Sequence, residues 1–111
     1  MDKSISQSEF YILLSLAIKK RHGYEIMKQV EADSGKKVLL GPGTLYGSIK
    51  RMLENKLIEE VDGENKRRKY YDLTEKGRSS LSSELTRYND AVELAKRKSL
   101  FRNLGLAKFA L

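Results

Sequence analysis

The sequence lacks cysteine and tryptophan, and it holds one histidine and one proline among its 111 residues. Without cysteine, neither a disulfide framework nor a thiolate metal site can form. One histidine and no dense group of carboxylates argue against a catalytic metal centre, so we expect no metal and no cofactor. No nucleophile stands beside a base in a recognisable motif, and Gly41-Pro42-Gly43 is better explained as a helix start than as a phosphate-binding loop. We therefore expect no catalytic residues and no enzymatic activity.

A long hydrophobic run is also missing. The longest apolar stretch, from Ile12 to Ile18, is interrupted by Ser15, whereas a membrane-spanning helix takes about 20 apolar residues. The first four residues lack the charged-then-apolar order of a signal peptide. These observations predict a cytoplasmic protein without a membrane partner.

Basic residues outnumber acidic ones, since 22 Lys and Arg against 15 Asp and Glu give a net charge of +7. Residues 1–35 are neutral, and the excess lies in residues 36–77 (10 basic, 7 acidic) and 78–111 (7 basic, 3 acidic). A basic chain favours polyanions, although charge alone is weak evidence for such a partner.

Two helices are predicted in the first third of the chain. Ser6 or Ser8 can cap the first helix, and the cations at 19–21 are expected in its last turn. A second helix is expected from about Tyr24 to Asp33, with His22 as a capping or surface group rather than a ligand. The connector at 36–40 can pair briefly as a strand. The expected buried stripe of the first helix consists of Phe10, Leu13, Leu14, Ala17 and Ile18.

A third helix is predicted from Pro42 to about Asn55, because proline suits a first helical position. At 100° per residue this helix divides into two faces. The apolar face, expected in the core, consists of Leu45, Ile49, Met52 and Leu53. The polar face, which has little bulk near its start, consists of Thr44, Gly47, Ser48, Lys50, Arg51 and Glu54.

Two β-prone runs follow at 57–61 and 69–73, and the Asp-Gly step between them is a strong signal of a hairpin. Four consecutive cations, at 66–69, begin the returning strand, and we expect some of them to pair with the acidic residues opposite. Tyr70 and Tyr71 alternate across this strand, so one of them faces inward, and we expect Tyr71 in the core.

Thr74 is expected to cap a last helix with apolar residues spaced four, three, four and three apart, as in a heptad seam. Its first residues could instead fold back on the preceding domain. This stripe has five apolar side chains, more than a single small domain would cover. We therefore expect a second copy of the helix to pack against it. The predicted domains are 1–76 and 77–111, and the path of residues 99–111 stays open. The seam consists of Leu81, Leu85, Tyr88, Val92 and Ala95.

This order of elements predicts a mainly α fold with a small β-hairpin, a winged helix-turn-helix followed by a long C-terminal helix. In that fold the third helix enters the major groove of DNA, and the hairpin, or wing, reaches the adjacent backbone or minor groove. The simpler alternatives to DNA contact are that the polar helix face and the cationic strand are merely exposed to solvent. A helix face with small polar side chains that is directly followed by a cationic hairpin favours DNA binding. The candidate contacts are Thr44, Gly47, Ser48, Lys50, Arg51, Lys66, Arg68 and Lys69.

Four segments carry a resemblance to a known family: His22-Gly23-Tyr24-Glu25-Ile26, Gly41-Pro42-Gly43-Thr44-Leu45-Tyr46, Leu57-Ile58-Glu59 and the run from Arg68 to Gly77. Together and in this order they resemble the PadR family of transcription regulators, in particular its short branch with one C-terminal helix. The resemblance covers roughly residues 6–95. It implies a homodimer joined by the final helices, regulation of nearby genes, often as a repressor, and, in some members, release by aromatic or drug-like ligands.

The resemblance also bears on single residues. It implies that the Tyr46 hydroxyl reaches a DNA phosphate, the alternative being a half-buried structural tyrosine. The family usually has glycine where this chain has Lys56, so a left-handed backbone at Asn55 or Lys56 would cost about 1 kcal/mol of strain. Members known for binding flat drugs use a tryptophan in the dimerisation helix, which this chain lacks.

We therefore expect a sequence-specific regulator that binds double-stranded DNA as a homodimer on a near-palindromic operator. Repression, and release by a small aromatic ligand, are what the resemblance adds. The alternative is a winged-helix module for protein interaction or ligand sequestering that does not bind DNA, against which the basic wing and the lean third helix argue.

Overall fold

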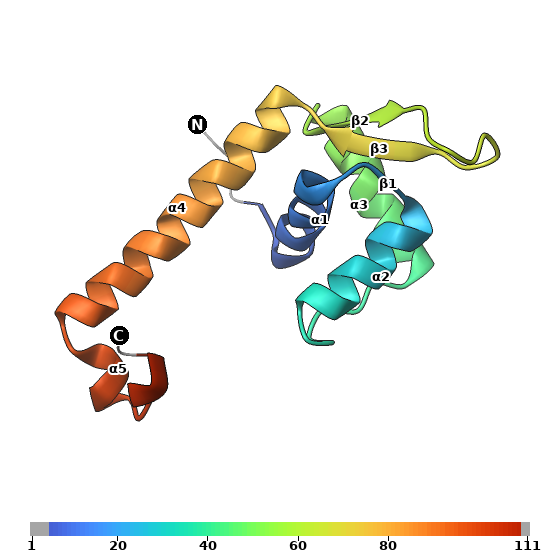
Figure 1. Cartoon of the computed structure of the whole chain (residues 1–111). Coiled ribbons are helices and arrows are strands. Elements are labelled where there is room, and N and C mark those ends of the chain that lie inside the picture. The colour runs from blue at the N-terminus through green and yellow to red at the C-terminus, as the bar shows by residue number, and fades with distance from the viewer. Residues whose placement is uncertain (1–4, 110–111) are drawn as a thin grey trace. The chain divides into compact units, whose positions relative to one another are not determined.

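The computed structural model describes residues 5–109 and confirms the predicted winged helix-turn-helix with its long C-terminal helix (Figure 1). The helices are α1 (Gln7–Ile18), α2 (Gly23–Asp33), α3 (Pro42–Glu54), α4 (Glu75–Arg97) and α5 (Leu100–Asn103), followed by a 3-10 helix, η1 (Ala107–Phe109). The strands are β1 (Arg21–His22), β2 (Ile58–Val61) and β3 (Tyr70–Leu73).

The sheet has three antiparallel strands in the order β1-β3-β2, one more than the predicted hairpin. β2 and β3 form the expected hairpin, in which Val61 lies opposite Tyr70. β1 adds two residues to the other edge of β3, where Arg21 pairs with Tyr71. The sequence did not reveal β1 because two polar residues show neither alternation nor β-branched side chains.

Helix α1 begins as predicted but buries a different set of side chains. The Ser6 hydroxyl accepts the Glu9 N–H at 3.1 Å, and the Glu9 carboxylate accepts the Ser6 N–H at 3.0 Å, which forms a capping box. The predicted stripe is wrong at its end, where Ala17 and Ile18 are exposed. Apolar residues occur nearly all round this helix, so their spacing does not identify the buried face. The buried residues are Phe10, Ile12, Leu13, Ser15 and Leu16.

The N-terminus of α2 is capped by His22, as predicted. Nδ1 of the imidazole accepts the Glu25 N–H at 3.3 Å, and the Glu25 carboxylate accepts the His22 N–H at 3.2 Å. The segments on either side of α2 differ from the prediction. Lys19–Arg21 lie beyond the end of α1 rather than in its last turn, and residues 36–40, all of them described, form no strand.

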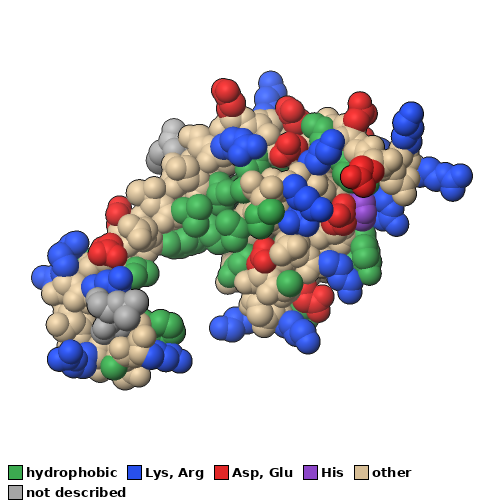
Figure 2. Space-filling view, viewed as in Figure 1, with side chains coloured by type: hydrophobic (Ala, Val, Ile, Leu, Met, Phe, Trp, Pro, Cys, Tyr) green, Lys and Arg blue, Asp and Glu red, His purple; other side chains and the backbone are tan. Residues whose placement is uncertain are grey.

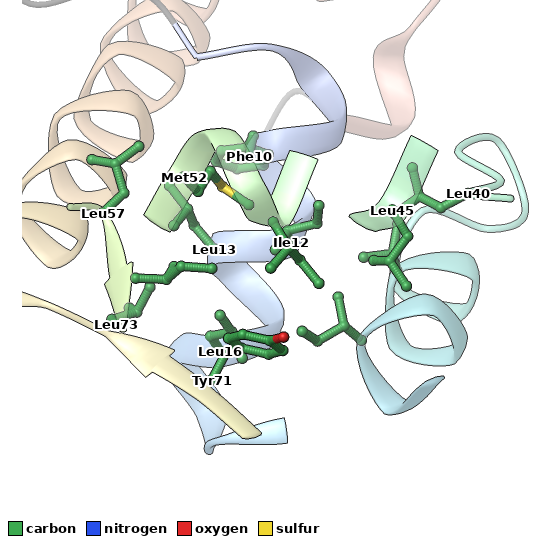
Figure 3. Close-up of a cluster of buried hydrophobic side chains, with 14 of the residues drawn as sticks. Phe10, Ile12, Leu13, Leu16, Leu40, Leu45, Met52, Leu57, Tyr71 and Leu73 are labelled. Atoms are coloured by element: carbon green, nitrogen blue, oxygen red, sulfur yellow. The ribbon is translucent and has the colours of Figure 1, made fainter. Parts of the chain in front are cut away.

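Helix α3 packs its apolar face into a core shared with α1, α2 and the sheet, as Figure 3 shows. Leu45, Ile49 and Met52 are buried, and Leu53 is partly buried against the same cluster. Tyr71 lies in this core, as predicted. The apolar half of the helix therefore fixes its position, so that the polar half faces away from the core.

The C-terminus of α3 places Lys56 in the left-handed region, with φ 59°. The Leu57 N–H donates to the Met52 carbonyl at 2.9 Å and the Lys56 N–H to the Leu53 carbonyl at 3.0 Å, which is a Schellman motif. Of the two residues at which a left-handed backbone was considered, Asn55 and Lys56, Lys56 has it. A side chain in this conformation costs about 1 kcal/mol relative to glycine.

The chain divides into two compact units, Met1–Leu81 and Ser82–Leu111. The second unit contains most of α4, together with α5 and η1. In it the Leu106 N–H donates to the Phe101 carbonyl, and the rings of Phe101 and Phe109 lie 6.2 Å apart. Of the segment 99–111, whose path the sequence left open, residues 99–109 therefore turn back on themselves, and residues 110 and 111 lie outside the described range. The functional division at residues 76 and 77 stays a prediction.

Candidate nucleic-acid interface

The exposed face of α3 carries three of the polar side chains expected to contact DNA. Thr44, Lys50 and Arg51 are exposed, and Gly47 between them is partly exposed. The helix starts without a bulky side chain on this face, since Gly43 precedes Thr44. A face of this kind can approach the edges of base pairs closely.

Ser48 does not belong to the exposed face, because only 1% of its surface is accessible. It lies three residues after Leu45 and four before Met52, in line with two buried side chains. Its hydroxyl accepts a hydrogen bond from Nη2 of Arg51 at 3.1 Å. The expected contact of Ser48 with DNA is corrected accordingly: Ser48 holds Arg51 from the buried side.

Tyr46 is packed against its own chain and accessible at the same time, with 53% of its surface exposed. Its ring lies against Gly23 at the start of α2, where a Cβ atom would stand 2.7 Å from the tyrosine hydroxyl. Glycine at this position therefore lets α2 and the ring approach closely. The contact fixes an accessible tyrosine near the start of α3, and its contact with a phosphate stays a prediction.

The wing loop, residues 62–69 between β2 and β3, carries the four consecutive cations. All four, at 66–69, are exposed, and Lys and Arg side chains project from the end of the hairpin in Figure 2. The expected pairs with the acidic residues opposite do not form: in the described range 5–109 no wing cation lies within ion-pair distance of a carboxylate. The positive charge of the wing loop is therefore available to an external anion.

Asn65 organises the wing loop. Its N–H donates to the Tyr70 hydroxyl at 3.2 Å, its side-chain oxygen accepts the Arg67 N–H at 3.0 Å, and its carbonyl accepts the Arg68 N–H at 3.0 Å. The Tyr70 ring fills the space beneath Gly63, where a Cβ atom would overlap the ring. Tyr70 is therefore buried, as Tyr71 is. The alternation of side chains along a strand had predicted that one of these two tyrosines faces inward.

The wing loop also meets the start of α2. Nη1 of Arg68 lies 3.5 Å from Nδ1 of His22, and the His22 ring packs edge-on against Tyr70 with centroids 5.4 Å apart. Because Gly23 follows His22 and contacts Tyr46, the exposed face of α3 and the wing loop are joined through the first residues of α2. No pattern in the sequence indicates this junction, because it depends on β1.

The hydroxyl of Tyr71 has a raised pKa. Burial raises the pKa of its hydroxyl above the usual value of 10.0, and the charges of Glu60 and Tyr46 add to this effect. The hydroxyl therefore stays protonated at neutral pH, which suits a core residue.

The predicted seam on α4 divides into buried and exposed positions. Leu81 is buried within the core of the first unit. Leu85, Tyr88 and Val92 are 44%, 46% and 41% exposed, and Ala95 is partly exposed. The exposed stripe of α4 is thus shorter at its start than predicted, because Leu81 is already covered by its own chain.

The described range contains neither a group of metal ligands nor a membrane-spanning helix. Within residues 5–109, no three His, Cys, Asp or Glu side chains are grouped so that they could hold a metal ion. In the same range, no helix has the length and apolar character needed to cross a membrane.

Comparisons with known proteins agree with this geometry. Residues 12–83 match the model of the transcriptional regulator PadR-like family. A 37.1 kDa protein of transposon Tn4556 from Streptomyces fradiae is 34% identical over 79 residues, which are 71% of this chain and 22% of that protein. The chain thus spans about a fifth of that relative's length.

Solved structures show the same fold. A PadR family transcription regulator from Clostridium difficile R20291 is 28% identical, covers 83% of this chain and 97% of its own, and superposes with a TM-score of 0.67. RosR of H. salinarum, 21% identical, covers 98% of both chains with a TM-score of 0.72 and supports the fold alone.

Proposed function

The chain belongs to the PadR-like family of transcriptional regulators, and on that basis we propose that it binds duplex DNA as a homodimer, with α3 in the major groove and the wing loop on the adjacent backbone. The observation that carries this proposal is the junction of two surfaces. A lean polar face on α3 and a wing loop whose cations lack carboxylate partners are joined through His22 and Gly23. A member of this family is a regulator rather than an enzyme.

The two surfaces have different parts in binding. We assign donation to guanine edges to Arg51, whose exposed side chain is hydrogen-bonded to Ser48, and the close approach of the helix to the bases to Thr44 and Gly47. The wing cations Lys66, Arg68 and Lys69, together with Lys50 and the Tyr46 hydroxyl, neutralise or bind phosphates. Phosphate contacts of this kind give affinity without sequence preference and weaken as salt rises.

The dimer forms through α4 in this proposal. Leu85, Tyr88, Val92 and Ala95 follow heptad spacing, and the first three are more than two-fifths exposed. Packing against the same stripe of a second copy would remove these side chains from water. A two-fold dimer reads a near-palindromic operator, with half-sites roughly one helical turn apart.

The sense of regulation and the effector are proposed from what the family resemblance implies. We propose repression, because a dimer bound across a promoter blocks access to it. We further propose an aromatic effector between the paired α4 helices, where Tyr88 supplies the stacking surface that tryptophan offers elsewhere.

The test starts by selecting bound sequences from a random DNA pool and titrating the selected duplex. Arg51→Ala is expected to weaken binding by about 1–3 kcal/mol and to relax the preference at one base position. Arg68→Ala is expected to weaken binding about equally on all sequences. It should also make the slope of log K against log salt concentration shallower by about one. Lys28→Ala, an exposed cation on α2 outside both surfaces, is the matched control.

No binding to any duplex at low salt would contradict the proposal. That result would favour the protein-interaction or ligand-sequestering module instead.

A further inference from the structure

The wing loop receives little support from the sheet. The ladder between β2 and β3 ends where Val61 faces Tyr70, and β1 pairs only at Arg21 and His22. An open hollow lies beside the loop, with His22 and Lys66 in its lining. Close packing therefore does not fix the loop on that side, and its position depends on individual hydrogen bonds.

One of these bonds comes from the other edge of the sheet. Nζ of Lys20 donates to the backbone carbonyl of Asp62 at 2.7 Å, across 42 residues of sequence. Lys20 directly precedes β1 and Asp62 directly follows β2, and these two strands lie on opposite sides of β3. The bond therefore joins both edges of the sheet at the root of the wing loop.

The loop is held a second time by Tyr70. Its hydroxyl accepts the Asn65 N–H, and Asn65 in turn positions the backbone of Arg67 and Arg68. Lys20 acts at the first residue of the loop and Tyr70 at its middle. Both contacts therefore restrict the path of the loop that carries the four cations.

We propose that Lys20 is a positioning residue of the wing: it holds the wing loop through the Asp62 carbonyl and thereby sets where the cations at 66–69 meet the DNA backbone. That Lys20 holds the wing loop concerns the free protein and can be measured without DNA. Only the contact between the cations and the DNA backbone rests on the proposed function.

The experiment compares Lys20→Met with Lys19→Met, the exposed lysine next to it, which loses the same charge and whose side chain forms no hydrogen bond within residues 5–109. Trypsin is added to the native protein, and cleavage after residues 66–69 is followed by mass spectrometry. Lys20→Met is expected to raise the cleavage rate about three- to tenfold over Lys19→Met, the range that one hydrogen bond gives to a local opening. Lys20→Arg, which keeps a donor, is expected to restore slow cleavage with an unchanged thermal midpoint.

Tyr70→Phe is a second, independent variant. It keeps the ring beneath Gly63 and removes only the hydroxyl, so cleavage in the wing loop is expected to rise as well. If Tyr70→Phe opens the loop while Lys20→Met and Lys19→Met are cleaved at equal rates, Lys20 is a solvated lysine and the proposal is overturned.

DNA binding separates the two proposals. Lys20→Met is expected to lower affinity for the selected duplex more than Lys19→Met does. Faster cleavage of Lys20→Met with unchanged affinity would support the positioning of the loop and contradict the contact between the wing and DNA.

Discussion

Nε of Arg21 donates a hydrogen bond to the backbone carbonyl of Ser15 at 2.9 Å, and both residues are buried. The last four carbonyls of a helix have no partner within it, and Ser15 supplies one of those carbonyls in α1. Arg21 belongs to β1, so its side chain ties the end of α1 to the sheet. A residue that was predicted in the last turn of the first helix is therefore part of the interior, in β1.

Replacing Arg21 by methionine is expected to destabilise the protein, because the Ser15 carbonyl loses a charged donor while staying buried. The expected loss is about 1.5–3 kcal/mol in the free energy of unfolding, measured by urea denaturation. Lys19→Met, at an exposed position two residues earlier, is the control and should change stability by less than about 0.5 kcal/mol. Equal effects of the two variants would contradict the role of Arg21.

Lys56→Gly is expected to stabilise the protein, because Lys56 has a positive φ that glycine adopts without strain. The expected gain is about 0.5–1 kcal/mol, seen as a higher urea midpoint. Glu54→Gly, two residues earlier and still inside α3, should instead lose about 1 kcal/mol. A loss in both variants would mean that the lysine side chain contributes more than the strain costs.

Stability is expected to fall at alkaline pH partly through Tyr71. Its pKa is raised in the folded state, so the unfolded chain releases this proton first as pH rises past about 10. The stabilisation is complete below that pH and is lost as pH rises through the folded pKa. Tyr71→Phe should therefore lose less stability between pH 9 and about 11 than the parent protein does. Tyr24→Phe, at an exposed ring, controls for the removal of a tyrosine hydroxyl.

Leu85→Lys is expected to shift the protein from dimer to monomer, because it places a charge within the proposed contact between α4 helices. Sedimentation velocity measures the change, and the fold is checked by circular dichroism. Thr86→Lys introduces the same charge at an exposed polar position on the opposite side of the same helix and should leave the dimer intact. A parent protein that is monomeric at micromolar concentration would contradict the dimer itself.

Elements defined by local signals could be predicted from the sequence. Ser6 with Glu9 and Pro42 mark the starts of α1 and α3, and Thr74 caps α4 by accepting the Gly77 N–H at 3.0 Å. Each of these signals acts within three or four residues. The left-handed backbone at Lys56 was indicated by the family resemblance instead, because the family usually has glycine at that position.

Features that depend on tertiary contacts could not be predicted. β1 forms because β3 offers an edge, and Ser48 turns inward because α3 packs closely against the core. At the candidate interface, the exposed side chains of α3 and the wing were predictable from polarity and charge. The bonds that hold them, from Lys20 to Asp62 and from Asn65 to Tyr70, join residues whose proximity only the fold creates.

The three-stranded sheet has a consequence for how copies of the chain can associate. Its two outer strands are short: β1 has two residues, and β2 has four, of which Glu59 and Glu60 are exposed. Short edge strands with like charges resist pairing with another strand, and this protects a small sheet from edge-to-edge aggregation. Domain swapping and fibre growth through the sheet are therefore disfavoured.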